Sequence, residues 1–293
     1  MDLYLAGTGS PWNYVLNGVK DMDLYLAESG GLWGAYFNPN KGDNMEIYIA
    51  GTEDRGKYLS EDLEKNNPFV GTKILQSFYY CNDFTEKVIL PSVDKFMLDS
   101  GAFTFYTKGR HADWDEWVEK YADFINRNKV DLYFELDIDN LIGYEKVKYY
   151  RRRLEAMTGK PSIPVWHKSR GKEDFIQMCK DYDYVAIGGI TDQITRAEWK
   201  YFPYFIDTAH KHGAKIHGLG FTSISNLPKY HFDSVDSTSW TSGNRFGMIY
   251  KFNGKTMEQY NRPENMRLAD SKATARHNFA EWVKFQKYAE THF

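Results

Sequence analysis

Short apolar runs alternate with amphipathic stretches along the chain from residue 95 onward. The apolar runs predict strands at 95–98, 131–136, 162–166, 184–187, 215–219 and 232–235. The stretches between them place apolar residues at helical spacing and predict helices at 113–126, 144–157, 173–180 and 196–212. Strands and helices in strict alternation indicate an α/β fold with a parallel sheet.

Several helix boundaries carry their own signals. Asp113 and Glu116 form a capping pair at the start of the first predicted helix. Gly159 and Pro161 end the second helix. Pro203 is expected to bend the helix at 196–212, because proline removes one backbone hydrogen bond.

The N-terminal region contains a short repeat. The run Met1-Asp-Leu-Tyr-Leu-Ala6 recurs at residues 22–27 and, more loosely, as Met45-Glu-Ile-Tyr-Ile-Ala50. We interpret the copies as strands, with the first or the third opening the main sheet. They form a strand-rich extension, 1–52, within a catalytic domain at 1–255.

A TIM-type (β/α)8 barrel is favoured over an open doubly wound sheet. Polar, reactive residues follow nearly every predicted strand, which is where barrel enzymes place their active sites. Residues 256–293 are expected to form a helical appendage that docks on the barrel or on a partner subunit, so a homodimer is left open. The tail helix, from Ser271, carries an apolar face of Ala275, Phe279, Trp282, Val283 and Ala289.

Composition limits the protein class. A length of 293 residues suits one large domain, and 17% aromatic residues suggest rings that line a ligand site. Two cysteines, Cys81 and Cys179, make a four-cysteine zinc site unattainable and a disulfide framework improbable. With no apolar run of membrane-spanning length and no signal-peptide pattern, we expect no membrane partner. The expected location is the cytoplasm, or the host cytoplasm for a viral protein.

The charge distribution is uneven, although the net charge is only −3. Nine Lys/Arg residues and one acid, Glu155, lie between Lys146 and Lys172, which gives this segment a charge of +8. One interpretation is a solvated helix face. The other is a surface that contacts nucleic-acid phosphates. The candidates for such contacts are Arg151, Arg152, Lys168 and Arg170.

The residues after each strand carry the candidate chemistry. They are Asp99-Ser-Gly-Ala-Phe103, Asp137-Ile-Asp139, His167-Lys168, Gly188-Gly189, Gly218-Leu-Gly220 and the run from Asp233 to Asp236. Each alone is an ordinary turn or cap. Together, several carboxylates on one rim repel one another unless a metal, a cationic ligand or a shifted pKa accommodates them. Two carboxylates beside a glycosidic carbon can act as nucleophile and acid/base, whereas the same set could hold Mg²⁺.

This ordered series resembles the tRNA-guanine transglycosylases. The similarity covers about residues 95 to 245 and rests on the order of Asp99-Ser-Gly-Ala-Phe103, Asp137, Gly188-Gly189-Ile190, Gly218-Leu-Gly220 and Asp236. It implies a TIM barrel that exchanges a guanine in nucleic acid for another base. The enzyme class implied is a glycosyltransferase that needs no cofactor and no metal.

The resemblance also implies roles. Asp236 matches the nucleophile that attacks C1′, and Asp99 matches the general acid/base. Phe103 matches the aromatic that stacks on the base, and Asp137 matches the carboxylate that recognises the guanine edge. The remaining base-binding candidates are Ser100, His167, Gly188 and Gly189. The hydroxyls of 237–239, or nearby backbone N–H groups, should hold Asp236 ionised and aimed.

The chain departs from the family in one respect. The tRNA enzymes carry a zinc site of three cysteines and one histidine after the nucleophile, and here no cysteine follows Cys179. This favours similarity to a shorter, zinc-lacking branch, with viral members, that inserts 7-deazaguanines into DNA. The expected partners are DNA, in preference to tRNA, and a 7-deazaguanine base. Arg245 is expected to contact the nucleic-acid backbone.

Two rival functions remain open at this stage. The first is a barrel hydrolase that acts on a sugar or nucleoside, with water replacing the incoming base. The second is a non-catalytic barrel that binds nucleic acid. The presence of Asp99, Asp137 and Asp236 together speaks against the second.

Overall fold

The computed structural model describes residues 45–53, 59, 63, 66–107, 113–191, 193–261 and 270–293. The first two copies of the N-terminal repeat lie outside these residues. The third copy forms the opening strand of the sheet, β1 (Glu46–Ala50). It pairs in parallel with β2 on one side and β8 on the other.

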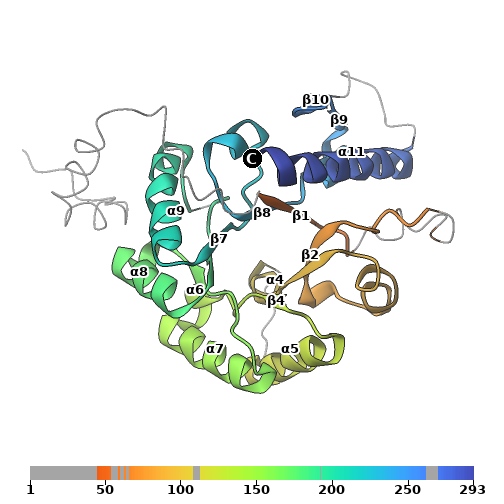
Figure 1. Cartoon of the computed structure of the whole chain (residues 1–293). Helices are drawn as coiled ribbons and strands as arrows, with labels where there is room; N and C mark the ends of the chain where they lie inside the picture. Colours follow the sequence, from red (N-terminus) through yellow and green to blue (C-terminus); the bar gives the residue numbers. More distant parts are fainter. Residues whose placement is uncertain are drawn as a thin grey trace, which may run out of the picture.

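Eight parallel strands form one sheet that curls into a barrel, seen along its axis in Figure 1. After β1 come β2 (Lys73–Ser77), β3 (Lys95–Asp99), β4 (Leu132–Tyr133), β5 (Val165–Trp166), β6 (Tyr184–Ile187), β7 (Lys215–Gly218) and β8 (Ser234–Ser237). The spatial order is β4-β3-β2-β1-β8-β7-β6-β5. A parallel bridge between Phe134 and Ile163 joins the two ends of this order, which closes the ring. The predicted TIM-type fold is therefore confirmed.

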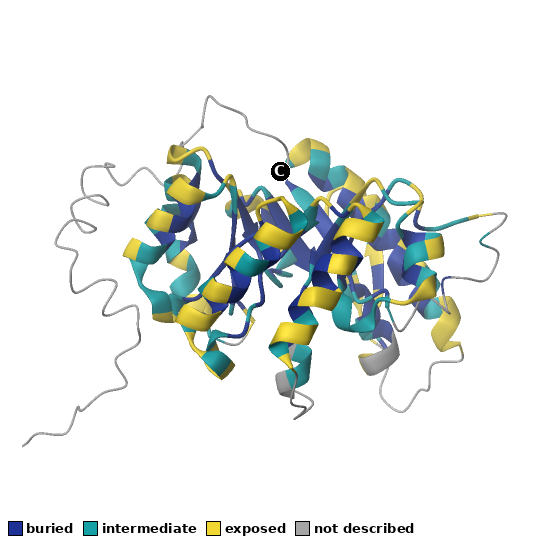
Figure 2. Ribbon diagram, turned by 90° about the horizontal axis from the view of Figure 1, so that it is seen from below, coloured by how far each residue is buried: buried dark blue, intermediate teal, exposed yellow. Residues whose placement is uncertain are grey.

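Helices surround the sheet. The longer ones are α5 (Trp114–Asn128), α7 (Tyr144–Thr158), α8 (Lys172–Asp181), α9 (Phe202–Lys211) and α11 (Ser271–His292). Shorter α-helices are α4 (Ala102–Thr107), α6 (Asp139–Ile142) and α10 (Ser242–Phe246). The 3₁₀ segments are η1 (Phe78–Tyr80), η3 (Lys168–Arg170), η4 (Arg196–Tyr201), η5 (Ile224–Lys229) and η6 (Ser239–Thr241), and η2 (Thr85–Ile89) is a π-helix. Figure 2 shows the buried strands inside and the exposed helix faces outside.

The local signals explain most of the helix boundaries. Asp113 caps α5, because its carboxylate accepts hydrogen bonds from the N–H groups of Asp115 and Glu116. Gly159 ends α7 in the left-handed conformation. Pro203 does not bend one long helix: η4 ends at residue 201, and the proline lies in the first turn of α9. Proline fits that position, where the backbone N–H would lack a partner in any case.

The predicted tail helix is confirmed and docks on the barrel itself. Phe279, Trp282 and Phe285 of α11 are buried in the main core between sheet and helices. Gln286 is fully buried and bonds to backbone groups of β1 and β2, through Ile47 O and Lys73 O and N. A hairpin of β9 (Ile249–Phe252) and β10 (Met257–Tyr260) packs beside α11.

The interior of the barrel is filled with side chains from alternate strand positions. Tyr48, Met97, Phe134, Val165 and Ala186 belong to this cluster. His217 from β7 also lies inside, fully buried, with the rings of Tyr48 and Phe134 against it. The barrel is therefore a packed core, and its chemistry must lie at one of its two ends. None of the described helices combines the length and apolar composition that a membrane crossing requires.

Candidate active site

The carboxylates predicted from the strand ends lie on one face of the barrel. Asp99 is the last residue of β3, Asp137 follows β4, and Asp236 is the third residue of β8. Because all eight strands are parallel, these positions share the C-terminal end of the barrel. The negative charges of Asp137 and Asp236 both act on Asp99. The structure thus brings the three carboxylates together.

Asp99 can carry a proton near neutral pH. Burial raises the pKa of Asp99 to about 7, and the charges of Asp137 and Asp236 add to that rise. The Gly101 N–H donates to Asp99 Oδ2 at 3.0 Å, and this hydrogen bond lowers the pKa of Asp99 in part. A carboxyl group with this pKa can donate a proton in one step and accept it in the next.

The glycine of the Asp-Ser-Gly sequence is required by this geometry. Gly101 has φ +70°, and a Cβ there would lie 2.6 Å from the backbone nitrogen of Tyr79 and 2.8 Å from Ser77 Oγ. Any larger residue would be strained at this φ and would collide with the backbone of η1. Ser100 is buried, and its Oγ accepts from the Ala102 N–H at 3.4 Å. This places Ser100 at the start of α4.

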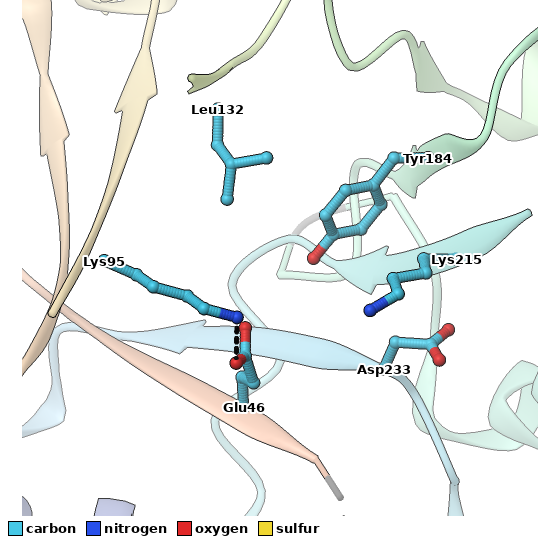
Figure 3. Close-up of a pocket in the computed structure, with 6 residues that line it drawn as sticks. All are labelled: Glu46, Lys95, Leu132, Tyr184, Lys215 and Asp233. Atoms are coloured by element: carbon cyan, nitrogen blue, oxygen red, sulfur yellow. Dashed lines mark hydrogen bonds and ion pairs between the residues drawn. The ribbon is translucent and has the colours of Figure 1, made fainter. Parts of the chain in front are cut away.

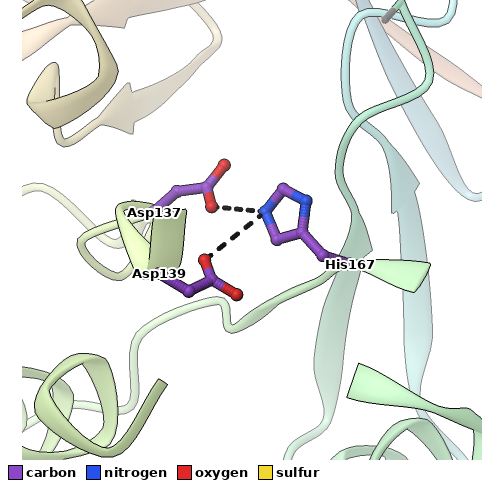
Figure 4. A group of neighbouring side chains, drawn as sticks. All are labelled: Asp137, Asp139 and His167. Carbon is purple, nitrogen blue, oxygen red and sulfur yellow. Dashed lines mark hydrogen bonds and ion pairs between the residues drawn. The ribbon is translucent and has the colours of Figure 1, made fainter. Parts of the chain in front are cut away.

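A second carboxylate is paired with a histidine (Figure 4). His167 Nε2 lies 2.5 Å from Asp137 Oδ1 and 3.9 Å from Asp139 Oδ1. Burial alone lowers the pKa of His167, but the charges of Asp137 and Asp139 outweigh it and hold that pKa above its ordinary value. Asp137 Oδ2 has no hydrogen-bond donor among the described residues, so this oxygen is available to a ligand.

Gly188 gives the histidine its space. A Cβ on Gly188 would lie 2.7 Å from His167 Cε1 and from Val165 Cγ1. A side chain at 188 would therefore displace the imidazole ring from Asp137. Gly189 has φ +69°, which favours glycine in the turn that follows β6. Its predicted role in base binding stays a prediction.

A buried network of charged side chains lies next to the pair of Asp137 and His167. Glu135 is fully buried, and its Oε1 accepts from the Val165 N–H at 2.7 Å. Burial raises the pKa of Glu135, while Arg151 and Arg170 oppose that rise. Arg170 Nε also donates to Asp139 Oδ2 at 2.8 Å, and this contact takes the pKa of Asp139 below its ordinary value despite the burial. The network fixes Asp139 and limits its freedom to act on a ligand.

The described residues hold Asp236 through one of its two carboxylate oxygens. Its Oδ1 accepts from the Gly220 N–H at 2.5 Å and lies 3.2 Å from His217 Nε2. Among the described residues nothing donates to Oδ2. The expected backbone N–H is thus present, but the second donor is His217, and the hydroxyls of 237–239 make no contact with this carboxylate. A carboxylate with one anchored and one open oxygen is arranged for attack on an electrophilic carbon.

The +8 segment does not form a free cationic surface. Within the described part of the chain, six of its nine cations have ion-pair partners. The pairs are Lys148 with Glu145, Arg151 with Glu135, Arg153 with Asp115 and Glu119, Lys160 with Asp131, Lys168 with Glu198, and Arg170 with Glu135 and Asp139. The side chains of Arg151 and Arg170 are 8% and 2% exposed. The prediction that these two contact phosphates is therefore wrong, because their charges balance Glu135 inside the fold. Arg152 is exposed, and its role stays a prediction.

For two predicted site residues the structure describes the backbone alone. Phe103 belongs to α4 and Arg245 to α10, but both side chains lie outside what the structure describes. Their predicted contacts with a base and with a nucleic-acid backbone stay predictions. The backbone position of Phe103, four residues after Asp99, puts α4 at the same end of the barrel as the carboxylates.

A small cavity lies at the opposite, N-terminal end of the strands (Figure 3). Its volume is about 140 Å³. It is lined by Glu46, Lys95, Leu132, Tyr184, Lys215 and Asp233. These residues begin their strands or precede them, so the cavity is separated from the three carboxylates by the packed barrel interior. Asp233 points to this end, where its Oδ2 accepts from the Ile216 N–H and contacts His210.

One group of the described residues has donor atoms close enough for a metal ion. Asp137, Asp139 and His167 each offer an atom within 4.8 Å of the others. Asp139 already balances the Arg170 guanidinium, and His167 is hydrogen-bonded to Asp137. A divalent ion bound by all three residues would therefore replace the hydrogen bond between His167 and Asp137, while Arg170 keeps its contact with the other oxygen of Asp139.

The raised pKa of Asp99 predicts an effect on stability. The carboxyl group binds its proton more tightly in the folded protein than in the unfolded chain, so its ionisation disfavours folding. This cost is absent below about pH 4 and complete above about pH 7, because the pKa rises from 3.8 to about 7 on folding. Asp99→Asn should therefore raise the free energy of unfolding at pH 8 by on the order of 2–4 kcal/mol. The gain should be smaller at pH 5.

Urea unfolding at the two pH values measures this difference. Asn keeps an acceptor oxygen for the Gly101 N–H, so the hydrogen bond is not the variable. Asp94→Asn, at an exposed position, is the matched control and should change little at either pH. An Asp99→Asn protein that is less stable than the wild type at pH 8 would show that the ionised carboxylate is stabilised by its surroundings.

The fold and site together define a TIM-type barrel with a carboxylate-rich C-terminal face. No protein-family model matches the chain, and no curated protein matches it. A solved structure from Aquifex aeolicus VF5 is similar, with a TM-score of 0.50 and 8% identity over 84% of this chain and 93% of that chain.

Two further solved structures are also similar. A protein assigned as a fructose-1,6-biphosphate aldolase from Coccidioides immitis has a TM-score of 0.49 and 10% identity, over 85% of this chain and 90% of that chain. The carboxyl transferase domain of Rhizobium etli pyruvate carboxylase has a TM-score of 0.45 and 10% identity, over 86% of this chain and 49% of that chain. Identities this low carry no information on the reaction, so the similarity to the Aquifex protein supports the fold alone.

Proposed function

We propose that this chain is a guanine transglycosylase that exchanges a guanine in DNA for a 7-deazaguanine base. One observation carries the proposal: three carboxylates on one barrel face have three different environments. Asp236 is anchored by one oxygen, Asp99 has a pKa of about 7, and Asp137 is paired with a histidine. Carboxylates in different environments can take separate roles in one reaction.

The roles follow from these environments. Asp236 Oδ2 attacks C1′ of the nucleotide, the C1′–N9 bond breaks, and the electron pair leaves with the guanine. Asp99 gives its proton to the departing base. The incoming base then returns a proton to Asp99 as its nitrogen attacks C1′, and the bond between C1′ and Asp236 breaks. Each step inverts C1′, so the exchange retains the original configuration.

Asp137 is the residue proposed to recognise the base. Its open Oδ2 can accept hydrogen bonds from the N1–H and the exocyclic amine of a guanine-type edge, while His167 holds Oδ1 in place. Adenine has neither donor in that arrangement and would leave the carboxylate unpaired, which is costly in a buried site. A 7-deazaguanine has the same N1–H and exocyclic amine as guanine, so Asp137 can bind both bases.

DNA is proposed as the nucleic acid on the strength of the resemblance to the zinc-lacking branch. The target guanine would have to leave the helical stack before C1′ can reach Asp236. Because most cations of the +8 segment are paired, the candidates for phosphate contacts are Arg152, which is exposed, and Arg245. The hydrolase alternative uses the same carboxylates and differs only in what attacks the glycosyl-enzyme.

Chelation should leave the activity unchanged. The proposed reaction uses carboxylates for covalent and acid/base work, and no step of it needs a metal ion. The measurement is the rate of base exchange after dialysis against EDTA, with and without added Mg²⁺ or Zn²⁺. A loss of activity that either ion restores would overturn the assigned roles and favour a metal-dependent hydrolase.

Base exchange can be tested directly with radiolabelled guanine. The full chain is incubated with labelled guanine and with duplex DNA, single-stranded DNA or tRNA, and the label in the polymer is counted. The proposal predicts label in DNA and little in tRNA. Release of guanine with no incorporation would identify the hydrolase instead, and label in tRNA alone would overturn the choice of DNA.

A further inference from the structure

The barrel interior contains a chain of hydrogen-bonding side chains that ends at Asp236. It runs through three neighbouring strands, from Tyr184 at the start of β6 to Ser234 at the start of β8 and His217 in β7. The Tyr184 hydroxyl lies 2.5 Å from Ser234 Oγ, and Ser234 Oγ contacts His217 Nδ1. His217 Nε2 lies 3.2 Å from Asp236 Oδ1.

The partners fix the direction of every hydrogen bond when the imidazole is neutral. A carboxylate only accepts, so His217 Nε2 must carry the ring proton and Nδ1 must accept. Ser234 then donates to Nδ1, and Tyr184 donates to Ser234. The reverse tautomer would set the lone pair of Nε2 against Asp236. Burial raises the pKa of Tyr184, so its hydroxyl stays protonated and can donate the first hydrogen bond of the series.

The surroundings leave the imidazole little freedom. His217 is fully buried, and the rings of Tyr48 and Phe134 lie 6.3 Å and 5.4 Å from it, centroid to centroid. Ser234 is also fully buried. Figure 3 shows Tyr184 projecting inward from its strand at the N-terminal end. The relay therefore connects that end of the barrel to the face with the carboxylates.

We infer that His217 is a positioning residue for Asp236, held in its Nε2–H tautomer by Ser234 and Tyr184. The inference rests on the proposed function, in which Asp236 is the nucleophile. Together with the Gly220 N–H, His217 grips Oδ1 and leaves Oδ2 to attack C1′. In the glycosyl-enzyme the same two donors bind the ester carbonyl oxygen. They then stabilise the carboxylate as it departs in the second step.

The test compares two replacements of the histidine. His217→Leu removes the donor. His217→Gln keeps one, because its side-chain amide nitrogen is separated from Cβ by the same number of bonds as Nε2 of histidine. His217→Leu should lower kcat for base exchange by about 10²–10³-fold with KM for the oligonucleotide unchanged. His217→Gln should recover to within about tenfold of the wild type. Equal losses in both variants, at unchanged thermal unfolding midpoints, would overturn the inference.

The tyrosine supplies a matched pair. Tyr184→Phe removes the first donor of the relay and should lower kcat. Tyr48→Phe makes the same chemical change beside the same imidazole, but the Tyr48 hydroxyl bonds to Glu46, so the relay stays intact. Ser234→Ala serves as the second variant if His217→Leu does not fold. Full activity in both Tyr184→Phe and Ser234→Ala would remove the proposed role of the relay.

A spectroscopic readout separates this inference from the proposed function. The ¹⁵N chemical shifts of the imidazole distinguish its two tautomers and need no substrate. The wild-type protein should show His217 protonated at Nε2, and Ser234→Ala should show a mixture. A wild-type Nδ1–H tautomer would overturn the inference whatever the enzyme acts on. Absence of base exchange by a wild-type protein with the Nε2–H tautomer would instead contradict the proposed function.

Discussion

Asp236→Asn should abolish base exchange while the protein still binds its oligonucleotide. The amide is a far weaker nucleophile than the carboxylate, but it has nearly the same shape, and its oxygen can still accept from the Gly220 N–H. We expect kcat to fall by at least about 10³-fold, with the dissociation constant for DNA changed little. Single-turnover release of guanine and a filter-binding assay measure the two quantities.

Asp233→Asn is the matched control for this prediction. Asp233 lies three residues earlier in the chain but at the opposite end of the barrel, where it contacts His210 and the Ile216 N–H. Its variant should exchange bases at nearly the normal rate. If Asp236→Asn itself retained activity, the nucleophile would be misassigned. Asp139 would then be the next carboxylate to test, because Asp233 is on the wrong face.

Asp99→Asn should lose the pH dependence of the first step together with most of its rate. Asp99 must be protonated to assist the departing guanine, and its pKa is about 7. The wild-type rate of guanine release should therefore fall about tenfold per pH unit above pH 7. The variant should be slower by about 10²–10⁴-fold, with a rate that no longer changes over that range.

Rapid-quench measurements between pH 5.5 and pH 9 test this behaviour. Asp94→Asn again serves as the control and should keep the wild-type profile. A wild-type rate that rises through pH 7 would mean that the ionised form of Asp99 is needed in the first step. A variant that keeps the same decline above pH 7 would assign the titrating proton to another group.

The barrel could be predicted from the sequence because its strands and helices follow simple periods. The run Tyr184–Ile187 is apolar throughout and was predicted with its observed bounds. β2 was missed, since Lys73-Ile-Leu-Gln-Ser77 contains only two apolar residues. Its polar residues are satisfied by tertiary contacts: Gln76 donates to Thr52, and Lys73 pairs with Glu290. Such contacts are not visible in a local pattern.

The position of the site could also be predicted, because polar residues at the ends of parallel strands must share one face. The partners of those residues could not. A count of charges identified the +8 segment but did not show that Arg151 and Arg170 balance Glu135.

His217 was missed for a different reason. A single histidine within a short apolar strand is usually a core residue, and nothing local links it to Asp236. The link arises only because β7 and β8 are neighbours, with His217 opposite Ser234 in the register. The glycines of the site are easier to understand afterwards. Gly101 and Gly188 lie where a Cβ would collide with Tyr79 and with His167.

The most direct test of the account is to trap the glycosyl-enzyme. The Asp99→Asn variant forms the adduct slowly, but it also lacks the group that takes the proton of the incoming base, so the adduct should accumulate during a long incubation with a guanine-containing oligonucleotide. The reaction is denatured in acid, and the digested protein is analysed by mass spectrometry. The account predicts a covalent sugar adduct on the peptide that contains Asp236, and no adduct in the Asp99→Asn, Asp236→Asn double variant. An adduct on another carboxylate, or guanine release with no adduct in any variant, would contradict it.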